Sequence, residues 1–366
     1  MELREILLDL PGRPDSYRIL VAPGLRRRLP ELLAPLNPSR PLFLISDERV
    51  ARLHGAAVKG DLEEAGYNSL LLTTPVGERA KTWGVVQRLA RELLARGAHR
   101  RSLLLALGGG VVGDAAGFLA SIFMRGIPFV QIPTTVLAMV DAAIGGKTAI
   151  NLPEGKNLLG TFHQPRLVAI DPEFLETLPP AQRRNGLAEV LKAGFIRDPD
   201  LLARLDAARG RLFEDFEELA DIIYRTAAIK ARVVAADERE GGLRRILNFG
   251  HTLGHALEQA SRYRLPHGPA VAWGMAAALY LSERLCGLPH EEARRGRSLL
   301  RSFGLLRRPP ALDPRAVLAA LPMDKKREAG GLVFILLRRL GEPVIHEGAP
   351  LGLIEEALIN ALSGER

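Results

Sequence analysis

The segment that decides the fold runs from residue 103 to residue 121 and reads LLLALGGGVVGDAAGFLAS. Its first five residues are apolar and predict a buried strand, and residues 115–121 predict a helix. Between them Gly108, Gly110 and Gly113 match the pattern G-x-G-x-x-G, in which small residues let backbone amides approach a pyrophosphate at a helix N-terminus. The match alone is weak, because Pro133 stands where an acidic ribose ligand is expected about 20 residues on. A plain tight turn is therefore the alternative to a dinucleotide-binding turn.

Around this turn the first half of the chain alternates strand-like and helical segments, which predicts a mostly parallel sheet. Further strands are predicted at residues 42–45, 70–72 and 129–132, and a helix at residues 82–95. From about residue 172 the pattern changes to long helical segments. These are residues 186–195, 212–236, 250–261 and 270–286, with one late strand at residues 332–337. We therefore predict an α/β domain followed by a helical domain, with the boundary near residues 172–178.

The composition is that of a globular protein, since 47% of the 366 residues are apolar and 25% are charged. This length predicts two domains. A single cysteine, Cys286, excludes an intramolecular disulfide and favours a reducing cytoplasm. The N-terminus shows no secretory signal, and the longest apolar stretch, residues 269–281, is shorter than the roughly 20 residues of a membrane span. We expect a soluble, cytoplasmic protein.

Lysine is much rarer than arginine in this chain. Only eight of the 50 are lysine, and the formal net charge is +8. The arginines are scattered without interleaved aromatic residues, so a nucleic-acid-binding protein is the weakest hypothesis. A lysine ammonium is a compact charge that can lose a proton, whereas a guanidinium cannot. All lysines except Lys59 fall in the segments singled out below. This indicates that these positions need an ammonium group, which arginine cannot replace.

A candidate metal site is formed by histidines and one acidic residue. His251 and His255 lie four residues apart, which places both on one face of a predicted helix. His267 follows in a loop, and Glu189 is an acidic residue on an otherwise apolar helix. Three such ligands with an open position are typical of a catalytic zinc-type site. Spacing alone favours His251 and His255 together, completed by His267 or Glu189. We expect the following histidines on the surface: His54, His99, His290 and His346.

Polar residues that follow predicted strands are candidates for binding a dinucleotide. Asp47 closes an early strand and is a candidate for the ribose in place of the residue missing after the glycines. Glu78 and Lys81 form another polar set at a predicted strand end, and the pair Thr134 and Thr135 offers hydroxyls to phosphate or ribose.

Several cations lie in glycine-rich or apolar segments, where an uncompensated charge is costly. They are Arg125, Lys147, Lys156, Lys192, Lys230, Arg244, Lys325 and Lys326, with the polar residues Asp141, Asn157 and Asn248 in the same segments. This set predicts an anionic ligand that carries a phosphate, and a carboxylate with it.

At these residues the sequence resembles the 3-dehydroquinate synthase family over nearly the whole chain. The motifs that carry the resemblance are residues 108–114, 133–138, 141–151, 155–157, 187–192, 247–255 and 324–326. The resemblance implies a dehydroquinate synthase-like fold. Its parts are an N-terminal Rossmann-like α/β domain that binds NAD, residues 1–174, and an all-α C-terminal domain that binds metal and substrate, residues 175–366.

The resemblance also implies roles for individual residues. Metal ligands for Zn²⁺ or Co²⁺ are implied at Glu189, His251 and His267, so that His255 faces the substrate instead. The predicted NAD-binding residues are Asp47, Glu78, Lys81, Gly109, Gly110, Gly113, Asp114, Thr134, Thr135, Asp141, Lys147, Lys156 and Thr177. Substrate contacts are implied at Arg125, Asp141, Lys147, Asn157, Lys192, Lys230, Asn248, His255 and Lys325. Arg244 is implied to be supplied across a homodimer interface.

The implied reaction converts 3-deoxy-D-arabino-heptulosonate 7-phosphate to 3-dehydroquinate and phosphate in the shikimate pathway. Its steps are oxidation by NAD⁺, β-elimination of phosphate, re-reduction, ring opening and aldol closure, so NAD is regenerated. No carboxylate base besides Asp141 suggests itself. We hypothesise that the substrate's own phosphate takes the proton in the elimination.

Two other enzyme classes share these features in part. A metal-dependent polyol dehydrogenase of the glycerol dehydrogenase type has a similar fold and metal geometry, but it needs no phosphate-binding cations. A sister sugar-phosphate cyclase that makes an inosose or a valiolone differs at several substrate contacts, whereas Lys230, Asn248, His255 and Lys325 match the dehydroquinate pattern.

Overall fold

The computed structural model describes residues 2–10, 16–307, 312–321 and 332–363. The chain divides into two compact units, Met1–Pro179 with Phe213–Glu238, and Pro180–Leu212 with Arg239–Arg366. Helix α8 (Phe216–Ala236) belongs to the first unit, where it contacts strands β1 and β2. The predicted boundary after residue 174 differs from this division chiefly at α8, because nothing in the local sequence of a helix tells which unit it packs against.

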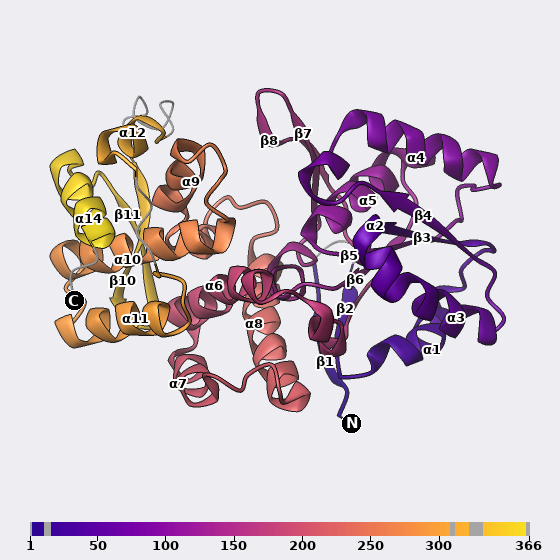
Figure 1. The fold of residues 1–366 in the computed structure, drawn as a ribbon, viewed down its shortest axis with the longest axis horizontal. Helices are drawn as coiled ribbons and strands as arrows, with labels where there is room; N and C mark the ends of the chain where they lie inside the picture. The colour runs from indigo at the N-terminus through magenta and orange to yellow at the C-terminus, as the bar shows by residue number, and fades with distance from the viewer. Residues whose placement is uncertain (1, 11–15, 308–311, 322–331, 364–366) are drawn as a thin grey trace. The chain divides into compact units, whose positions relative to one another are not determined.

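The first unit is built on a seven-stranded sheet in the order β1-β2-β9-β6-β5-β3-β4 (Figure 1). The strands are β1 (Arg4–Leu8), β2 (Tyr17–Val21), β3 (Leu42–Asp47), β4 (Ser69–Thr74), β5 (Leu104–Gly108), β6 (Phe129–Pro133) and β9 (Leu167–Ile170). Neighbouring strands are parallel except β1 and β2. The four predicted strands are confirmed as β3 to β6, since buried parallel strands appear in sequence as continuous apolar runs. Strands β1, β2 and β9 were not predicted.

Helices α4 (Trp83–Ala95) and α5 (Gly110–Ile122) cover one face of this sheet. Side chains alternate along β3, so Phe43 and Ile45 face the core that these helices close. Helix α4 begins where the hydroxyl of Thr82 accepts a hydrogen bond from the amide of Val85. The helix predicted at residues 82–95 is confirmed, with its buried stripe at helical spacing: Val86, Leu89 and Leu93.

A separate antiparallel hairpin lies between β6 and β9 in the chain. It consists of β7 (Lys147–Leu152) and β8 (Gly155–Phe162). Strand β8 is largely exposed, and the sequence did not predict the hairpin because it lacks a buried apolar run.

The second unit is helical, as predicted. Its helices are α6 (Pro180–Arg197), α7 (Pro199–Ala208), η8 (Leu243–Asn248), α9 (His251–Ala260), α10 (His267–Leu285), α11 (His290–Ser302), α12 (Pro314–Ala319) and α14 (Leu351–Ser363). Helix α10 is central, because it contacts α6, α9, α11 and α14. The late strand predicted at residues 332–337 is confirmed as β10 (Val333–Arg339), and it pairs with β11 (Glu342–Glu347), so the unit is not entirely α.

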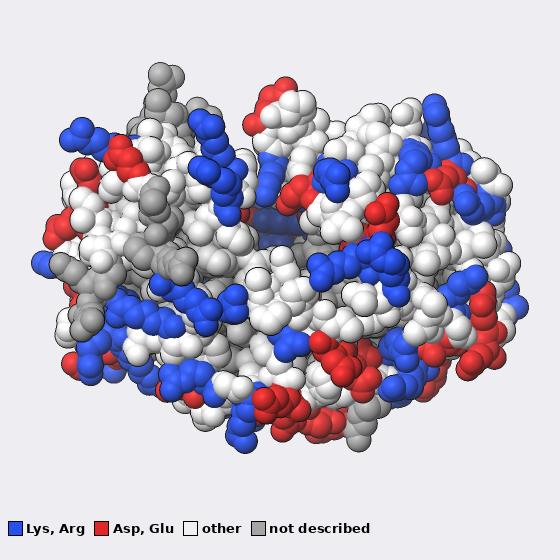
Figure 2. Space-filling view, in the orientation of Figure 1, with Lys and Arg blue, Asp and Glu red and all other residues white. Residues whose placement is uncertain are grey.

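The surface charge and the helix lengths bear on whether the protein binds nucleic acid and whether it spans a membrane. Figure 2 shows lysine and arginine side chains in several groups over the face in view, with acidic side chains among them. On this face the basic side chains do not form a continuous strip of the kind that binds nucleic acid. Within the described part of the chain, none of the helices is both long enough and apolar enough to span a membrane.

Candidate active site

In the first unit, the glycine-rich turn lies where the strand order reverses. Strands β3 and β5 are neighbours, and the chain leaves them toward opposite edges of the sheet. Ligands of open α/β sheets bind outside the carboxyl ends of the strands at such a point. Asp47 closes β3, and its Oδ1 accepts the amides of Arg49 (2.9 Å) and Val50 (3.0 Å). The predicted ribose ligand and the glycine turn therefore lie at adjacent strand ends.

The glycine turn is closely packed, which explains its composition. A Cβ on Gly113 would lie 2.7 Å from the side-chain oxygen of Gln131, and one on Gly110 would lie 2.9 Å from Ala142 Cβ. Gly109 is the N-cap of α5, and the side chain of Thr135 would lie 3.2 Å from a Cβ there. The hydroxyl of Thr134 is buried and has no hydrogen-bond partner within the described ranges. These features fit a helix N-terminus that receives an anionic ligand with a hydroxyl nearby.

Lys81 connects the glycine helix to the β7–β8 hairpin. Its side chain is only 3% exposed, and Nζ donates to Asp114 Oδ2 (2.5 Å) and to Asn157 Oδ1. Burial raises the pKa of Asp114 to about 6, against the lowering effect of Lys81. A buried ammonium with two fixed acceptors is a setting in which a guanidinium would not fit.

The tip of the hairpin is tied to Glu78 by a second set of contacts. Asn151 Nδ2 donates to Glu78 Oε2 (2.7 Å), and Asn151 Oδ1 accepts the amide of Asn157 (3.0 Å). Lys156 Nζ lies 3.4 Å from Glu78 Oε1. Four of the predicted residues, Glu78, Lys81, Lys156 and Asn157, are thus brought together. Asn151, the last residue of the 141–151 motif, was not among the predicted site residues.

Asp141 and Lys230 form another connection within the first unit. Asp141 lies in a π-helical turn, η6 (Ala138–Ala142), and Lys230 lies on α8. Lys230 Nζ donates to the carbonyl oxygen of Asp141 (2.7 Å) and to its carboxylate. By contrast, Lys147 and Arg125 are exposed, and Arg125 has a φ of 70°.

Thr177 lies at the end of η7 (Pro172–Thr177), where it contacts a residue that the sequence analysis had placed on the surface. His54 is half-buried, its Nε2 lies 2.8 Å from Thr177 Oγ1, and burial lowers its pKa. No sequence signal joins positions so far apart in the chain.

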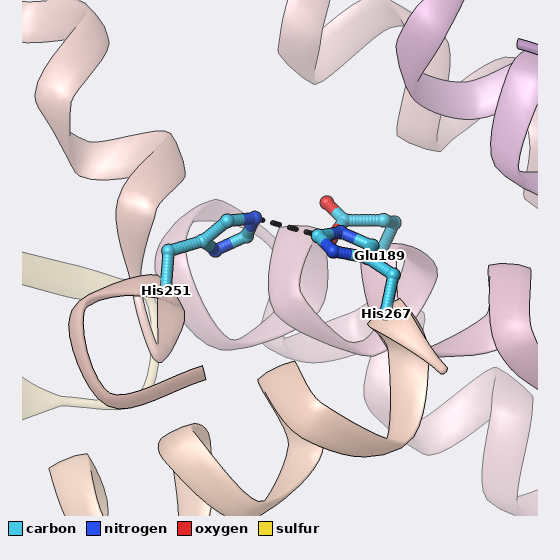
Figure 3. A group of neighbouring side chains, drawn as sticks. All are labelled: Glu189, His251 and His267. Atoms are coloured by element: carbon cyan, nitrogen blue, oxygen red, sulfur yellow. Dashed lines mark ion pairs between the residues drawn. The ribbon is translucent and has the colours of Figure 1, made fainter. Parts of the chain in front are cut away.

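In the second unit, Glu189, His251 and His267 converge from three helices (Figure 3). Glu189 lies on α6 and is 1% exposed, while the histidines are the first residues of α9 and α10. Glu189 Oε1 lies 3.5 Å from His251 Nε2 and 3.4 Å from His267 Nε2. One ligand atom from each residue lies within 4.8 Å of the others.

Close packing of α9 on α10 sets this geometry. A Cβ on Gly274 would lie 1.9 Å from the carbonyl oxygen of Gly250, the residue before His251. Gly250 itself has a φ of 78°, which glycine adopts without strain. The approach of two helix backbones therefore places His251 and His267 on either side of Glu189.

The charges of this cluster fit a divalent cation. Neither oxygen of Glu189 has a hydrogen-bond partner in the described chain, although Lys192 forms an ion pair with Oε2. Burial alone would raise the pKa of Glu189, but Lys192, His251 and His267 lower it well below the ordinary value. Burial, and then Lys192, lower the pKa of His251 to about 3. Burial acts in the same direction on His267, but Glu189 and Glu258 raise its pKa to about 10. One carboxylate and two imidazoles with an open side are a zinc-type ligand set.

His255 does not join the group around Glu189, so the pairing favoured by spacing alone is wrong. Its side chain is 63% exposed, and Nε2 lies 4.0 Å from Glu258 Oε2. Although His251 and His255 share a face of α9, with ring centroids 5.3 Å apart, Glu189 lies beside the first turn only. The ligand set implied by the family resemblance is the one that the geometry brings together.

The remaining predicted substrate residues of the second unit have different surroundings. Arg244 is 3% exposed, and its supply across a homodimer interface stays a prediction. Asn248 Nδ2 donates to Glu240 Oε1 (2.7 Å). Lys192 is buried beside Glu189. Lys325 and Lys326 lie outside the described residues.

Comparison with known proteins decides the family. Residues 71–185 match the family described as 3-dehydroquinate synthase N-terminal, and residues 186–327 match 3-dehydroquinate synthase C-terminal. The chain belongs to the 3-dehydroquinate synthase family. The 3-dehydroquinate synthase of Thermosynechococcus vestitus is 46% identical over 363 residues, covering 96% of this chain and 98% of that protein. The 3-dehydroquinate synthase of Gloeobacter violaceus is 47% identical over 336 residues, covering 91% and 92%.

Solved structures of sister cyclases have the same fold. A 2-epi-5-epi-valiolone synthase from Streptomyces hygroscopicus, with NAD⁺ and Zn²⁺ bound, is 31% identical with a TM-score of 0.87, covering 96% of this chain and 98% of that one. A 2-deoxy-scyllo-inosose synthase in complex with carbaglucose-6-phosphate, NAD⁺ and Co²⁺ is 27% identical with a TM-score of 0.88, covering 97% and 99%. A glycerol dehydrogenase from Schizosaccharomyces pombe, at 15% identity and a TM-score of 0.66, shares the fold alone.

These findings confirm the fold and the reaction predicted for the 3-dehydroquinate synthase family. The chain is an enzyme with 3-dehydroquinate synthase activity, which belongs to the shikimate pathway. Curated relatives above 40% identity are dehydroquinate synthases, whereas the similar valiolone and inosose synthases are 27–31% identical. Both the polyol dehydrogenase and the sister cyclase hypotheses are therefore set aside.

Proposed function

We propose that this enzyme converts 3-deoxy-D-arabino-heptulosonate 7-phosphate to 3-dehydroquinate and phosphate with NAD⁺ and one divalent cation, Zn²⁺ or Co²⁺. The observation that carries the proposal is the convergence of Glu189, His251 and His267 on one point. The bound groups of the sister cyclases, NAD⁺ with Zn²⁺ and NAD⁺ with Co²⁺, support it. The single free cysteine, Cys286, supports a cytoplasmic location.

The first unit would hold NAD⁺ at the strand ends around the glycine turn. The amides at the start of α5 bind the pyrophosphate, and Asp47 binds a ribose. Thr134, Thr135 and Thr177 offer further hydroxyls. The cluster around Glu78, Lys81 and Asp114 orients the nicotinamide half and keeps the hairpin residue Asn157 in place.

The second unit would hold the cation through Glu189 Oε1 and the Nε2 atoms of His251 and His267. When bound, the cation supplies Lewis acidity to the hydroxyl that is oxidised, and NAD⁺ accepts the hydride and later returns it. His255 is exposed one turn beyond His251, a place where a neutral imidazole can exchange a proton with a substrate hydroxyl.

The retained cations would bind the two anionic groups of the substrate. In the first unit these are Arg125, Lys147 and Lys230, with Asn157 as a hydrogen-bond donor. In the second unit they are Lys192, Arg244 and Lys325, with Asn248. We propose a homodimer as the working form. Arg244 would be supplied to the partner's site across the dimer interface.

The surroundings of Asp141 support a proton transfer to the leaving phosphate. Its carboxylate and its carbonyl oxygen both accept hydrogen bonds from Lys230 Nζ, so the carboxylate is already engaged within its own chain. We therefore assign Asp141 to positioning Lys230, which binds the substrate, and assign the proton acceptance to the substrate's phosphate. Asp141→Asn should retain full turnover under this assignment, and a loss confined to the elimination step would contradict it.

One assay tests the proposed function as a whole. The enzyme is given the heptulosonate phosphate with and without NAD⁺, and before and after chelation. Phosphate release should need both NAD⁺ and the cation, and no net NADH should accumulate. Accumulation of NADH would instead indicate a polyol dehydrogenase.

A further inference from the structure

Each imidazole that faces Glu189 has a second contact on its other ring nitrogen. The Nε2 atoms of His251 and His267 both point toward Glu189 Oε1, at 3.5 and 3.4 Å. On the opposite side, His251 Nδ1 lies 3.2 Å from the carbonyl oxygen of Phe249. His267 Nδ1 lies 3.6 Å from Glu258 Oε2. The first partner is neutral, and the second is a carboxylate.

A histidine that binds a cation through Nε2 must carry its proton on Nδ1. The acceptor of that proton fixes the tautomer and the ring orientation, and a carboxylate also makes the coordinating nitrogen more basic. The separation of 3.6 Å between His267 Nδ1 and Glu258 Oε2 is an ion-pair distance, longer than a hydrogen bond. Glu258 Oε2 is the carboxylate oxygen that faces this ring nitrogen.

Glu258 is well placed to fix the orientation of the His267 ring. Its side chain is only 12% exposed. The end of α9 around it is fixed, because its carbonyl oxygen accepts the hydroxyl of Ser261 (2.7 Å) and the amide of Tyr263 (2.7 Å). Glu258 therefore joins α9, which carries His251, to the start of α10, which carries His267.

A second cation is the competing interpretation of Glu258. His255, Glu258 and His267 also place ligand atoms within 4.8 Å of one another. A cation there would need His267 Nδ1 as a ligand while Nε2 serves the first site. The ring would then have to lose both protons, which is far costlier than donating one to a carboxylate. The geometry therefore favours a proton, not a cation, between His267 Nδ1 and Glu258 Oε2.

We propose that Glu258 is a positioning residue of the cation site, because its carboxylate accepts the Nδ1 proton of His267 and so directs Nε2 toward the bound ion. This inference rests on the proposed cation site and adds to it a residue outside the ligand set. It makes Glu258 act through His267, without contact with substrate or NAD⁺.

The test is the affinity of the full-length protein for Zn²⁺ or Co²⁺ alone, measured by competition with a chelator. Glu258→Gln should weaken binding by about tenfold, and Glu258→Ala by up to about a hundredfold. Glu258→Asp should recover part of the loss. The visible absorption bands of the Co²⁺-loaded protein should shift in Glu258→Gln, because the donor strength of His267 changes. Glu258→Gln should leave the melting temperature of the ion-free protein within about a degree of wild type.

Two control variants and one ligand variant separate the possible outcomes. Gln259→Ala changes an exposed neighbour on α9, and Glu291→Gln removes an exposed carboxylate from the same unit; both should bind the ion as wild type does. His251→Ala should lose the ion. If His251→Ala loses it while Glu258→Gln and Glu258→Ala keep wild-type affinity and absorption bands, the proposed site stands and the role of Glu258 is refuted. If wild type itself binds no ion, both ideas fail. Weaker binding that only follows a lowered melting temperature also refutes the positioning role.

Discussion

The two regions that carry the chemistry balance their buried charges in different ways. In the first unit, Lys81 meets Asp114 and Asn157, and Lys230 meets Asp141, so each ammonium already has protein acceptors. In the second unit, Lys192 forms an ion pair with Glu189 Oε2. Glu189 Oε1 faces two imidazole nitrogens at 3.5 and 3.4 Å and has no hydrogen-bond partner among the residues that the structure describes.

This difference indicates two kinds of binding site. The first region is a polar network that holds its own shape, so a cofactor adds contacts to an existing frame. In the second region the arrangement of donors is that of a coordination sphere, and a cation satisfies the carboxylate directly. Substitutions of these charged side chains should therefore act mainly on ligand affinity in the second region and mainly on stability in the first.

The largest effect is expected from Glu189→Gln, which keeps the shape of the side chain but removes the anionic ligand. Cation binding should be lost, and the turnover rate should fall by at least about a thousandfold, since Lewis-acid stabilisation is worth several kcal/mol. Metal content after dialysis and the phosphate-release assay measure the two effects. Retention of one tightly bound cation per chain would show that the coordination sphere lies elsewhere.

The next largest effect is expected at the backbone contact between Gly274 and Gly250, which sets the geometry of the cation site. Gly274→Ala would place a methyl group against the carbonyl oxygen of Gly250, a backbone atom that cannot move aside. We expect a loss of about 3 kcal/mol in the free energy of unfolding, together with weaker cation binding, because α9 must shift relative to α10. Gly352→Ala on α14 is the matched control, since nothing lies within 4 Å of the added atom. Equal urea midpoints for the two variants would contradict the packing argument.

A smaller effect concerns the pH dependence of the first region. The pKa of Asp114 is about 6 in the folded protein, above its ordinary value of 3.8. The folded state therefore binds more protons between these values, so this group's contribution to stability is greatest below about pH 4 and is lost as the pH rises through 6. Relative to Asp114→Asn, the wild-type free energy of unfolding should fall by about 2–3 kcal/mol from pH 4 to pH 7. Urea titrations at each pH measure it. A difference that stays constant across this range would show that Asp114 is not protonated in the folded state.

The fold of the first region was more predictable from the sequence than the ligand set of the second. The strands around the glycine turn were predictable because buried parallel strands are continuous apolar runs. Spacing favoured His251 with His255, completed by His267 or Glu189. The exclusion of His255 was not predictable, because the geometry depends on the contact between Gly250 and Gly274, which lie 24 residues apart in the chain. The family resemblance supplied that exclusion. The contacts of His54 with Thr177 and of Glu258 with His267 were not predicted, because tertiary packing alone brings these residues together.

The smallest expected effect separates a side-chain contact from a backbone contact. A Cβ on Gly113 would meet the side chain of Gln131 at 2.7 Å, but Gln131 is a flexible side chain and can move. Gly113→Ala should therefore cost only about 1 kcal/mol in stability, well below the loss expected for Gly274→Ala. NAD⁺ affinity should nevertheless fall, because the displaced glutamine crowds the turn at the start of α5. Gly113→Ala/Gln131→Ala should recover both the stability and the NAD⁺ affinity, as measured by urea unfolding and by fluorescence titration. If the double variant binds NAD⁺ no better than Gly113→Ala, crowding by Gln131 is not the cause of the lost affinity.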